Sequence, residues 1–176
     1  HTMDNDGPSS VKGRNGLVYT ASGTAYPCAT AIGCTWNVDL AYKMGEICAA
    51  EARPLGYTWT LAPCVDLAIN KLNPIVNLRC QGDDVQKAIR IGGAYMRGLQ
   101  DNGIIATLKH FPGDGVGFYD QHLTVAENTL SKEEWDNTYG KIYQTLINDG
   151  KHGRKAKRNR AGIRRGTGAC RKGRGL

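Results

Sequence analysis

The sequence Ile104-Ile105-Ala106-Thr107-Leu108-Lys109-His110-Phe111-Pro112-Gly113-Asp114-Gly115 decides the fold class. Its first five residues form a short, almost wholly apolar run, which suits a parallel strand covered on both faces. Ligand sites of parallel α/β folds form at the carboxyl ends of strands, so Lys109 and His110 are candidate ligand-binding residues. Pro112 and the glycines predict a tight loop that lets a ligand approach the backbone. Taken alone, the motif fits equally well a simple strand-to-helix turn.

Patterned segments on both sides of this run complete an α/β order. Residues 57–62 are β-branched and aromatic and predict a second strand, which Pro63 ends. Helices are predicted at 37–53, from Asp83 or Asp84 to Asn102-Gly103, and from Ser131 to Asp149-Gly150. Because helices and strands alternate with short connections, the two strands are expected to be parallel neighbours joined by the middle helix.

Two local patterns support the outer helices. In the first helix, apolar residues at three- and four-residue spacing predict the buried face: Leu40, Met44, Ile47 and Cys48. In the last helix, Ser131 and Glu134 have the spacing of a capping box.

The charge of the chain is divided between two segments. Residues 1–150 hold all 16 acidic residues and 12 Lys and Arg, a net charge of −4, whereas residues 151–176 hold 11 Lys and Arg and no acid. The basic segment is rich in Gly and Arg and lacks periodicity, so it cannot bury a core. We therefore expect an incomplete barrel domain over 1–150 and a basic tail over 151–176 that is disordered or out of frame.

The remaining composition suggests no membrane span, no metal and no cofactor. No apolar run reaches the length of a membrane-spanning helix, and the first ten residues lack the pattern of a signal peptide. The cysteines lack the close pairing of zinc sites and are expected to be buried thiols in a reduced, cytoplasmic compartment. They are Cys28, Cys34, Cys48, Cys64, Cys80 and Cys170.

A second group with chemical potential is Asp120-Gln121-His122, in the loop after the apolar strand. An Asp two residues before a His can hold one imidazole tautomer, which leaves the other ring nitrogen free to give and take a proton. An exposed loop histidine with no task is the alternative. The aspartate partner and the nearby His110 favour the functional interpretation.

Five landmarks in order resemble glycoside hydrolase family 3, and most closely its β-N-acetylhexosaminidase branch. The resemblance runs from about Met3 to Gly150. Its landmarks are Met3-Asp4-Asn5-Asp6-Gly7, Ala62-Pro63-Cys64-Val65-Asp66-Leu67, Asn73-Pro74-Ile75-Val76-Asn77-Leu78-Arg79, Lys109 to Gly115, and Asp120-Gln121-His122.

The resemblance implies a TIM-type (β/α)8 barrel and a retaining mechanism through an Asp nucleophile. A complete barrel takes roughly 250 residues, so this chain is expected to form a partial barrel, its first half to two-thirds. By resemblance, His122 is the acid/base and Asp120 orients it. The positions that match substrate-binding residues of the family are Asp4, Arg79, Lys109 and His110. Asp66 also matches a landmark, and we interpret it as a hydrogen-bond acceptor that shapes the loop.

Several functions remain open. The first is hydrolysis of β-linked N-acetylhexosamine, with β-glucosidase as the alternative in the same family; the loop that carries Asp120 and His122 favours the former. The family's nucleophilic Asp finds no match in the chain, so the isolated chain is expected to be inactive. A non-catalytic fragment is a further alternative. Another is a nucleic-acid binder acting non-specifically through the basic tail, although the tail lacks interleaved aromatic residues.

Overall fold

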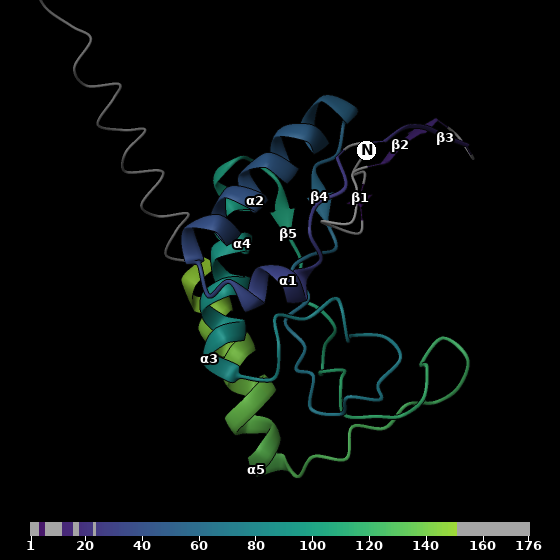
Figure 1. Ribbon diagram of the computed structural model, residues 1–176, viewed down its shortest axis with the longest axis vertical. Helices are drawn as coiled ribbons and strands as arrows, with labels where there is room; N and C mark the ends of the chain where they lie inside the picture. The colour runs from purple at the N-terminus through teal and green to yellow at the C-terminus, as the bar shows by residue number, and fades with distance from the viewer. Residues whose placement is uncertain (1–3, 6–11, 16–17, 23, 151–176) are drawn as a thin grey trace, which may run out of the picture.

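The computed structural model describes the backbone of residues 4–5, 12–15, 18–22 and 24–150, and the side chains of residues 24–150. Figure 1 shows the arrangement of the described elements. The basic segment 151–176 lies outside the described residues, as does Cys170, and the expectations for them stay predictions.

Three short parallel strands form the sheet on which the candidate site is built. They are β1 (Asp4–Asn5), β4 (Trp59–Thr60) and β5 (Ile105–Ala106), in the order β1-β4-β5. Trp59 lies opposite Ile105 in parallel register, which confirms that the two predicted strands are parallel neighbours. A separate antiparallel hairpin consists of β2 (Lys12–Asn15) and β3 (Val18–Ser22).

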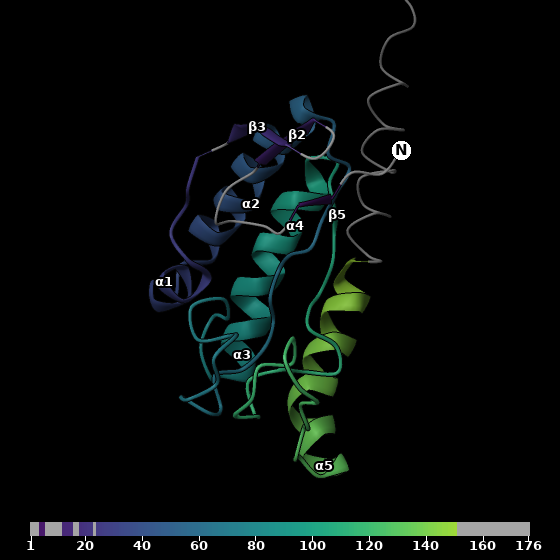
Figure 2. The same ribbon diagram turned by 90° about the vertical axis from the view of Figure 1, so that its right-hand side faces the viewer.

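The helices cover one side of this sheet, as the two views of Figures 1 and 2 agree. The first are α1 (Ala29–Cys34) and α2 (Val38–Ala52), and a 3-10 turn at Arg53–Leu55 follows α2. The second helical segment is continuous and consists of α3 (Val85–Lys87), a π-helical turn (Ala88–Gly92) and α4 (Gly93–Asp101). The third comprises α5 (Lys132–Trp135), a π-helical turn (Asp136–Gly140) and a helical stretch over 141–150.

The predicted helix boundaries agree with local hydrogen bonds. The side chain of Asp84 accepts a hydrogen bond from the backbone N–H of Lys87 and so caps the second segment. Gly103, with φ of +84°, follows that segment in the left-handed conformation that ends helices. Ser131 and Glu134 form the predicted capping box. These caps are local, which is why the sequence pattern was sufficient to place them.

The buried face of α2 differs from the prediction. Leu40 and Ile47 are 43% and 38% exposed, and the buried residues are instead Ala41, Met44, Gly45, Cys48, Ala49 and Ala52. The reason is the close approach of α4. A Cβ atom on Gly45 would overlap the carbonyl oxygen of Tyr95, and one on Gly98 would overlap that of Tyr42. Small residues therefore face the neighbouring helix, and the large aliphatic residues are displaced to the rim.

The apolar run that ends in β5 is covered on one face only, contrary to the expectation of burial on both. Ile104 is buried among the residues of α2 and α4, and Ala106 packs against the same cluster. Ile105 points to the opposite face and is 58% exposed. Alternation along a strand places adjacent side chains on opposite faces, so helices on one side of the sheet cover only every second residue.

Two hydrophobic clusters hold the helices to the strands. The first lies between α2, α4 and the strands and includes Met44, Cys48, Tyr95, Leu99 and Ile104. The second joins the 85–101 segment to the last helix and includes Val65, Met96, Tyr139, Ile142 and Leu146. Tyr143 is buried in it, whereas Ile147 is exposed.

The cysteines of the described region are free thiols, as expected, but not all are buried. Cys48, Cys64 and Cys80 are buried, Cys28 is half-buried and Cys34 is exposed. Among the described residues, no helix combines the length and apolar character that a membrane crossing requires.

The glycine contact between α2 and α4 yields a stability prediction. Gly98→Ala should lower the free energy of unfolding by about 1–3 kcal/mol, because the added methyl group overlaps backbone atoms that cannot move aside. Urea unfolding followed by circular dichroism measures the change. Gly150→Ala is the matched control, since a Cβ there meets only ordinary contacts at 3.7 Å or more. A Gly98→Ala protein as stable as the control would contradict the close packing.

Candidate functional site

The site residues gather where β4 and β5 end. Beyond the two strands, Cys64 and Lys109 pair in an isolated parallel bridge. The backbone N–H of Val65 donates to the Lys109 carbonyl at 2.8 Å, and that of Lys109 donates to the Pro63 carbonyl at 3.2 Å. The peptide bond between Lys109 and His110 is cis. This bridge places the residues after Pro63 beside Lys109 and His110, although 45 residues separate Cys64 from Lys109.

The carboxylate of Asp66 organises the loop that follows β5. Asp66 is fully buried. It accepts hydrogen bonds from the backbone N–H groups of His110, at 3.1 Å, and Asp114, at 2.8 Å. Its Oδ2 lies 2.5 Å from His110 Nδ1 and accepts from Cys64 Sγ at 3.1 Å. The geometry agrees with the interpretation of Asp66 as a loop-shaping acceptor, and it adds the imidazole of His110 as a partner.

Because an ionised carboxylate can only accept, the proton of the Asp66–His110 bond belongs to Nδ1 of His110. The ring is thereby fixed in one tautomer, with Nε2 unprotonated when the histidine is neutral. The side chain of His110 is partly exposed, so the ring remains within reach of a ligand.

Asp114 and Asn73 brace the same loop, and sequence reasoning assigned a role to neither. Asn73 is buried, and its Nδ2 donates to Asp114 Oδ1 at 2.9 Å. The hydroxyl of Tyr139 donates to the Asp114 carbonyl. Gly115, with φ of +103°, approaches the Leu67 carbonyl so closely that a side chain would overlap it. Asn73 and the Gly113-Asp114-Gly115 turn each belong to a family landmark. Their hydrogen bond spans 41 residues, so no local sequence pattern predicts it.

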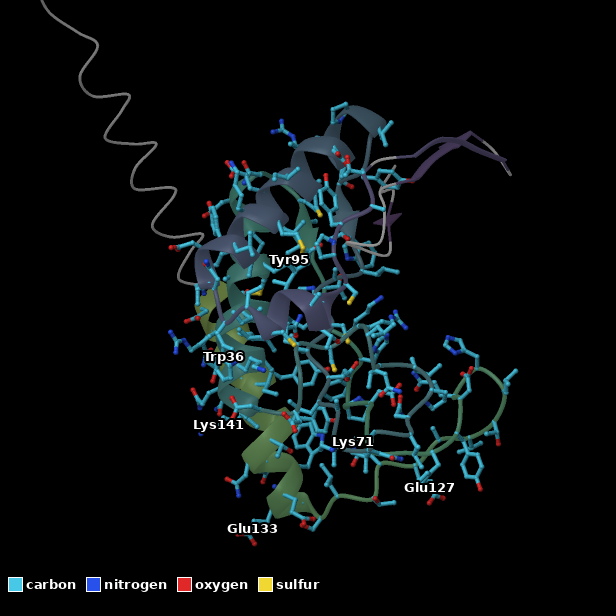
Figure 3. The ribbon with its side chains drawn as sticks, in the orientation of Figure 1. Trp36, Lys71, Tyr95, Glu127, Glu133 and Lys141 are labelled. Atoms are coloured by element: carbon cyan, nitrogen blue, oxygen red, sulfur yellow. The ribbon has the colours of Figure 1, made fainter. Side chains whose placement is uncertain are left out.

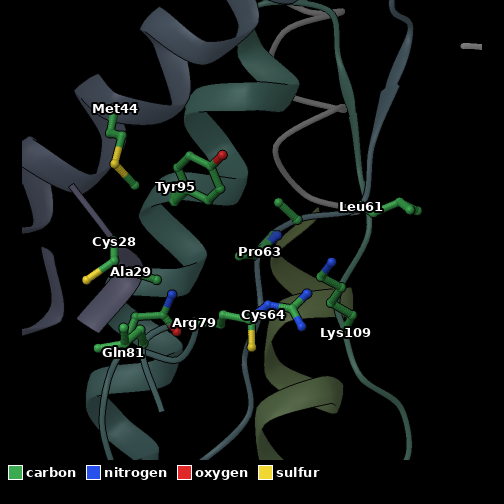
Figure 4. Close-up of a pocket in the computed structure, with 12 residues that line it drawn as sticks. Cys28, Ala29, Met44, Leu61, Pro63, Cys64, Arg79, Gln81, Tyr95 and Lys109 are labelled. Carbon is green, nitrogen blue, oxygen red and sulfur yellow. The ribbon is translucent and has the colours of Figure 1, made fainter. Parts of the chain in front are cut away.

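Arg79 and Lys109 line one cavity of about 50 Å³. Figure 4 shows Arg79, Cys64 and Lys109 at one end of it and Met44 and Tyr95 toward the other. The remaining lining residues are Cys28, Ala29, Leu61, Ala62, Pro63, Leu78 and Gln81. Two cations from different loops thus share a largely apolar pocket at the carboxyl ends of the strands, where the sequence predicted Lys109 to lie.

Asp120 and His122 form a hydrogen-bonded pair on an exposed loop. His122 Nδ1 lies 2.7 Å from Asp120 Oδ1, which also accepts the backbone N–H of His122 at 2.8 Å. The side chains are 70% and 30% exposed for His122 and Asp120, respectively. The backbone N–H of His122, and then its side chain, hold the pKa of Asp120 below its usual range. The arrangement predicted from the spacing, an imidazole oriented by a carboxylate, is present in the fold.

This loop does not contribute to the cavity formed by the described residues. The cavity lining includes neither Asp120 nor His122. Figure 3 shows the loop, marked by Glu127, standing away from the helices. Gln121 links it to the braced turn, since its Nε2 donates to Asp114 Oδ2 at 3.2 Å. The dyad is therefore attached to the same loop system as His110 but lies outside the pocket.

Of Asp4, the structure describes only the backbone. The backbone of Asp4 in β1 pairs with that of Trp59 in β4. Trp59 precedes Cys64 by five residues, which span about 16 Å in an extended chain. Arg79, Lys109 and His110 lie together where the strands end, and the substrate-binding role expected of Asp4 stays a prediction.

Breaking the Asp66 cluster should destabilise the fold. Asp66→Ala should lower the free energy of unfolding by about 3 kcal/mol, because partly buried donors on His110 and Asp114 lose their charged, buried acceptor. Asp66→Asn, which keeps one acceptor oxygen, should cost less. Urea denaturation provides the measurement, with the exposed Asp136→Ala as control, expected within about 0.5 kcal/mol of the parent. Equal stability of Asp66→Ala and the control would remove Asp66 from its structural role.

The Asp120 pair yields a prediction about pH. Its lowered pKa means that the hydrogen bonds to Asp120 order the loop above the ordinary carboxyl pKa, about 3.9, and are lost as pH falls through the lowered value. A carboxyl carbon titration by NMR should show the low pKa in the parent. His122→Ala should raise it part of the way, since the backbone N–H remains. An ordinary pKa in the parent chain would mean that the pair does not form in solution.

Comparisons with known proteins identify the chain's relatives. The model of the glycosyl hydrolase family 3 N terminal domain matches residues 9–153. A β-N-acetylglucosaminidase/β-glucosidase of Cellulomonas fimi is 40% identical over 117 residues, which are 66% of this chain and 21% of that protein. A β-hexosaminidase of Pseudomonas aeruginosa is 32% identical over 133 residues, 75% of this chain and 38% of its own length.

Solved structures agree with these matches. A β-glucoside phosphorylase bound to 2FGlc has a TM-score of 0.72 and 40% identity, covering 81% of this chain and 26% of its own. A family 3 β-N-acetylglucosaminidase from Paenibacillus sp. str. FPU-7 has a TM-score of 0.75 and 28% identity, covering 84% and 27%. The chain thus spans between 21% and 38% of the length of these relatives. With a family model over residues 9–153 and an α/β fold of the TIM-barrel type, the chain belongs to glycosyl hydrolase family 3.

Proposed function

We propose that the chain supplies the sugar-binding residues and the acid/base pair of a glycoside hydrolase acting on β-linked N-acetylhexosamine. The observation that carries the proposal is the Asp120–His122 hydrogen bond of 2.7 Å, on a loop joined to the turn that positions His110. The two groups differ in exposure in a way that suits their roles. His122 is open to a ligand, and its aspartate partner is the more covered of the two.

The chemistry follows from the free side of the imidazole. Asp120 holds Nδ1, so the opposite ring nitrogen of His122 can protonate the leaving glycosidic oxygen and later take a proton from the attacking water. An imidazole titrates close to neutral pH, which suits a group that must act in turn as acid and base. This assignment differs from the usual pair of carboxylates in glycosidases and resembles one branch of the family.

Sugar binding would fall to the residues at the strand ends. Arg79 and Lys109 are long donors that line the same cavity, and the apolar wall opposite them offers contact for the C–H faces of a pyranose ring. Asp66 fixes the His110 ring, so that its other nitrogen can meet a hydroxyl in one orientation. Rigid placement of such donors is how a site favours one arrangement of hydroxyls.

The choice between N-acetylhexosamine and glucose rests on the acid/base loop and is open to a direct test. The named relatives include enzymes of both kinds. The purified chain, titrated with N-acetylglucosamine and with glucose and followed by NMR, should bind the N-acetylated sugar more tightly. Lys109→Ala should weaken binding of both sugars. Tighter binding of glucose would favour the β-glucosidase alternative.

Inorganic phosphate, in place of water, is a second candidate acceptor of the glycosyl group. The chain is 40% identical to a β-glucoside phosphorylase over 81% of its length, and Arg79 and Lys109 place two cations in one pocket. A phosphorolytic enzyme would release a sugar phosphate at a rate that rises with inorganic phosphate. A hydrolase would release free sugar at a rate independent of phosphate.

The role of His122 can be tested in an active enzyme. Residues 9–153 of this chain, which match the family 3 N-terminal domain, would replace the corresponding segment of the Cellulomonas fimi relative. In that chimera, His122→Ala should reduce kcat by about 100-fold or more on an aryl glycoside with a poor leaving group, the range for loss of general acid catalysis. The loss should be much smaller on an activated leaving group, which departs without a proton. Val125→Ala, at an exposed position of the same loop, is the control variant, and equal losses on both substrates would exclude His122 as the acid.

The chain alone should not turn over glycosides at a useful rate. Residues that act as a catalytic unit fail together, and no aspartate in this sequence matches the nucleophile of the family. The assay uses a chromogenic β-N-acetylglucosaminide and a β-glucoside, with the His122→Ala chain alongside. Robust release that His122→Ala abolishes would show that another aspartate takes the nucleophile's place.

A further inference from the structure

Three side chains at the strand ends bring a sulfur, an oxygen and a nitrogen ligand atom together. Cys64, Asp66 and His110 offer atoms that all lie within 4.8 Å of one another. Cys64 and Asp66 are buried, and His110 is partly exposed. The cluster comes from two separate strand ends joined by the Cys64–Lys109 bridge, so it is a product of the tertiary fold. The roles proposed above for Asp120, His122, Arg79 and Lys109 do not involve the thiol of Cys64.

Two side-chain hydrogen bonds to Asp66 hold the cluster together. Asp66 Oδ2 receives one hydrogen bond from the Cys64 thiol at 3.1 Å and lies 2.5 Å from His110 Nδ1. The other carboxylate oxygen, Oδ1, is occupied by the backbone N–H of Asp114 at 2.8 Å. Main-chain donors therefore orient the carboxylate so that Oδ2 faces both the sulfur and the imidazole. Outer-shell hydrogen bonds of this kind orient metal ligands in proteins.

We propose that Cys64, Asp66 and His110 form a binding site for Zn²⁺, which replaces the two bridging protons. Thiolate, imidazole and carboxylate are the ligands that zinc takes in proteins, at about 2.3 Å for sulfur and about 2.0–2.2 Å for nitrogen and oxygen. Tetrahedral angles would then place Nδ1 about 3.4 Å and Sγ about 3.6 Å from Oδ2. Starting from 2.5 Å and 3.1 Å, the two distances to Oδ2 must each lengthen by less than about 1 Å, and the sulfur and nitrogen already lie within 4.8 Å of each other.

The proton balance of binding is simple. The Cys64 thiol loses its proton to solvent when sulfur bonds to the metal. The proton on His110 Nδ1 leaves as that nitrogen coordinates, and Nε2 takes up a proton, so a neutral histidine stays neutral. Asp66 neither gains nor loses a proton in this exchange. Zinc binding to the neutral-histidine form therefore releases one proton, and three protein ligands leave a fourth position for water.

The surroundings both allow and limit this binding. Cys64 lines the cavity beside Arg79 and Lys109, so the proposed metal site borders that cavity. The two cations repel a divalent ion, and burial raises the pKa of the Cys64 thiol well above its usual value. Both effects lower the affinity. The bond between thiolate and zinc, and the orientation of the Asp66 carboxylate by main-chain donors, raise the affinity.

Zinc at this site would change the sugar-binding residue. His110 would coordinate through Nδ1 and leave its hydrogen bond to Asp66, and its Nε2 would change from acceptor to donor. This consequence rests on the proposed function, in which His110 contacts the sugar. Zinc and sugar should therefore oppose one another, and each should weaken the binding of the other by the same factor.

Cobalt(II) is the probe for the site, because a thiolate–cobalt bond gives a charge-transfer absorption in the near ultraviolet. The chain, without an affinity tag, should develop this band on addition of Co²⁺ and lose it when Zn²⁺ displaces the probe. Cys64→Ser should abolish the band and raise the dissociation constant for Zn²⁺ by about 100-fold or more. Cys80→Ser, in the same hydrophobic cluster, and the exposed Cys34→Ser should retain it.

Two further measurements decide the outcome. Bound Zn²⁺ should protect Cys64, and not Cys34, from alkylation as read by mass spectrometry, and circular dichroism should show that Cys64→Ser is folded. Absence of the band, or its persistence in a folded Cys64→Ser chain, overturns the site. If the band appears as expected and the sugar binds equally with and without Zn²⁺, the site stands and the sugar contact of His110 is the part that fails.

Discussion

The arrangement of the candidate site depends on one buried carboxylate. Asp66 stands after β4 and accepts hydrogen bonds from groups on both sides of the turn that follows β5. A buried charge is costly unless it is fully hydrogen-bonded, so once the strands pair, the loop is constrained to present these donors to it. The position of His110, the conformation of Asp114 and the approach of Gly115 to Leu67 follow from this constraint. The candidate sugar site and the candidate metal site share the same cause.

The helices supply the rigid support behind this carboxylate. Gly45 and Gly98 let α2 and α4 approach backbone to backbone, and the cluster between them covers Ile104 at the start of β5. Close packing of small residues leaves little freedom for the strands to shift in register. The parallel pairing of β4 with β5 then sets Cys64 beside Lys109, which positions the ligands of the loop.

The pocket residues and the Asp120–His122 pair are attached to the fold in different ways. Arg79, Lys109 and His110 are held by the strand bridge, by Asp66 and by the cavity walls. Asp120 and His122 are held to each other, and Gln121 is their link to Asp114. A side chain on an exposed loop can move toward a ligand, whereas the pocket residues cannot move without disturbing the core. The fold thus separates a rigid pocket from the more exposed Asp120–His122 pair, the proposed proton-transfer group.

Local chemistry made part of this structure readable from the sequence. The apolar run before Lys109, the capping residues Asp84 and Ser131, and the spacing of Asp120 and His122 each act over a few residues, so pattern alone indicated parallel strands, helix ends and an oriented imidazole. The family landmarks identified the glycosidase relationship for the same reason, since each is a short contiguous motif.

The tertiary structure decided what depends on distant partners. It turned Ala41 and Gly45 of α2 inward in place of Leu40 and Ile47, because only the approach of α4 determines which side has room. It left Ile105 exposed, because helices cover one face of the strand. It also joined Asp66 to His110 and Asn73 to Asp114 across more than 40 residues, contacts that form only when separate strand ends meet, so no local pattern could predict them.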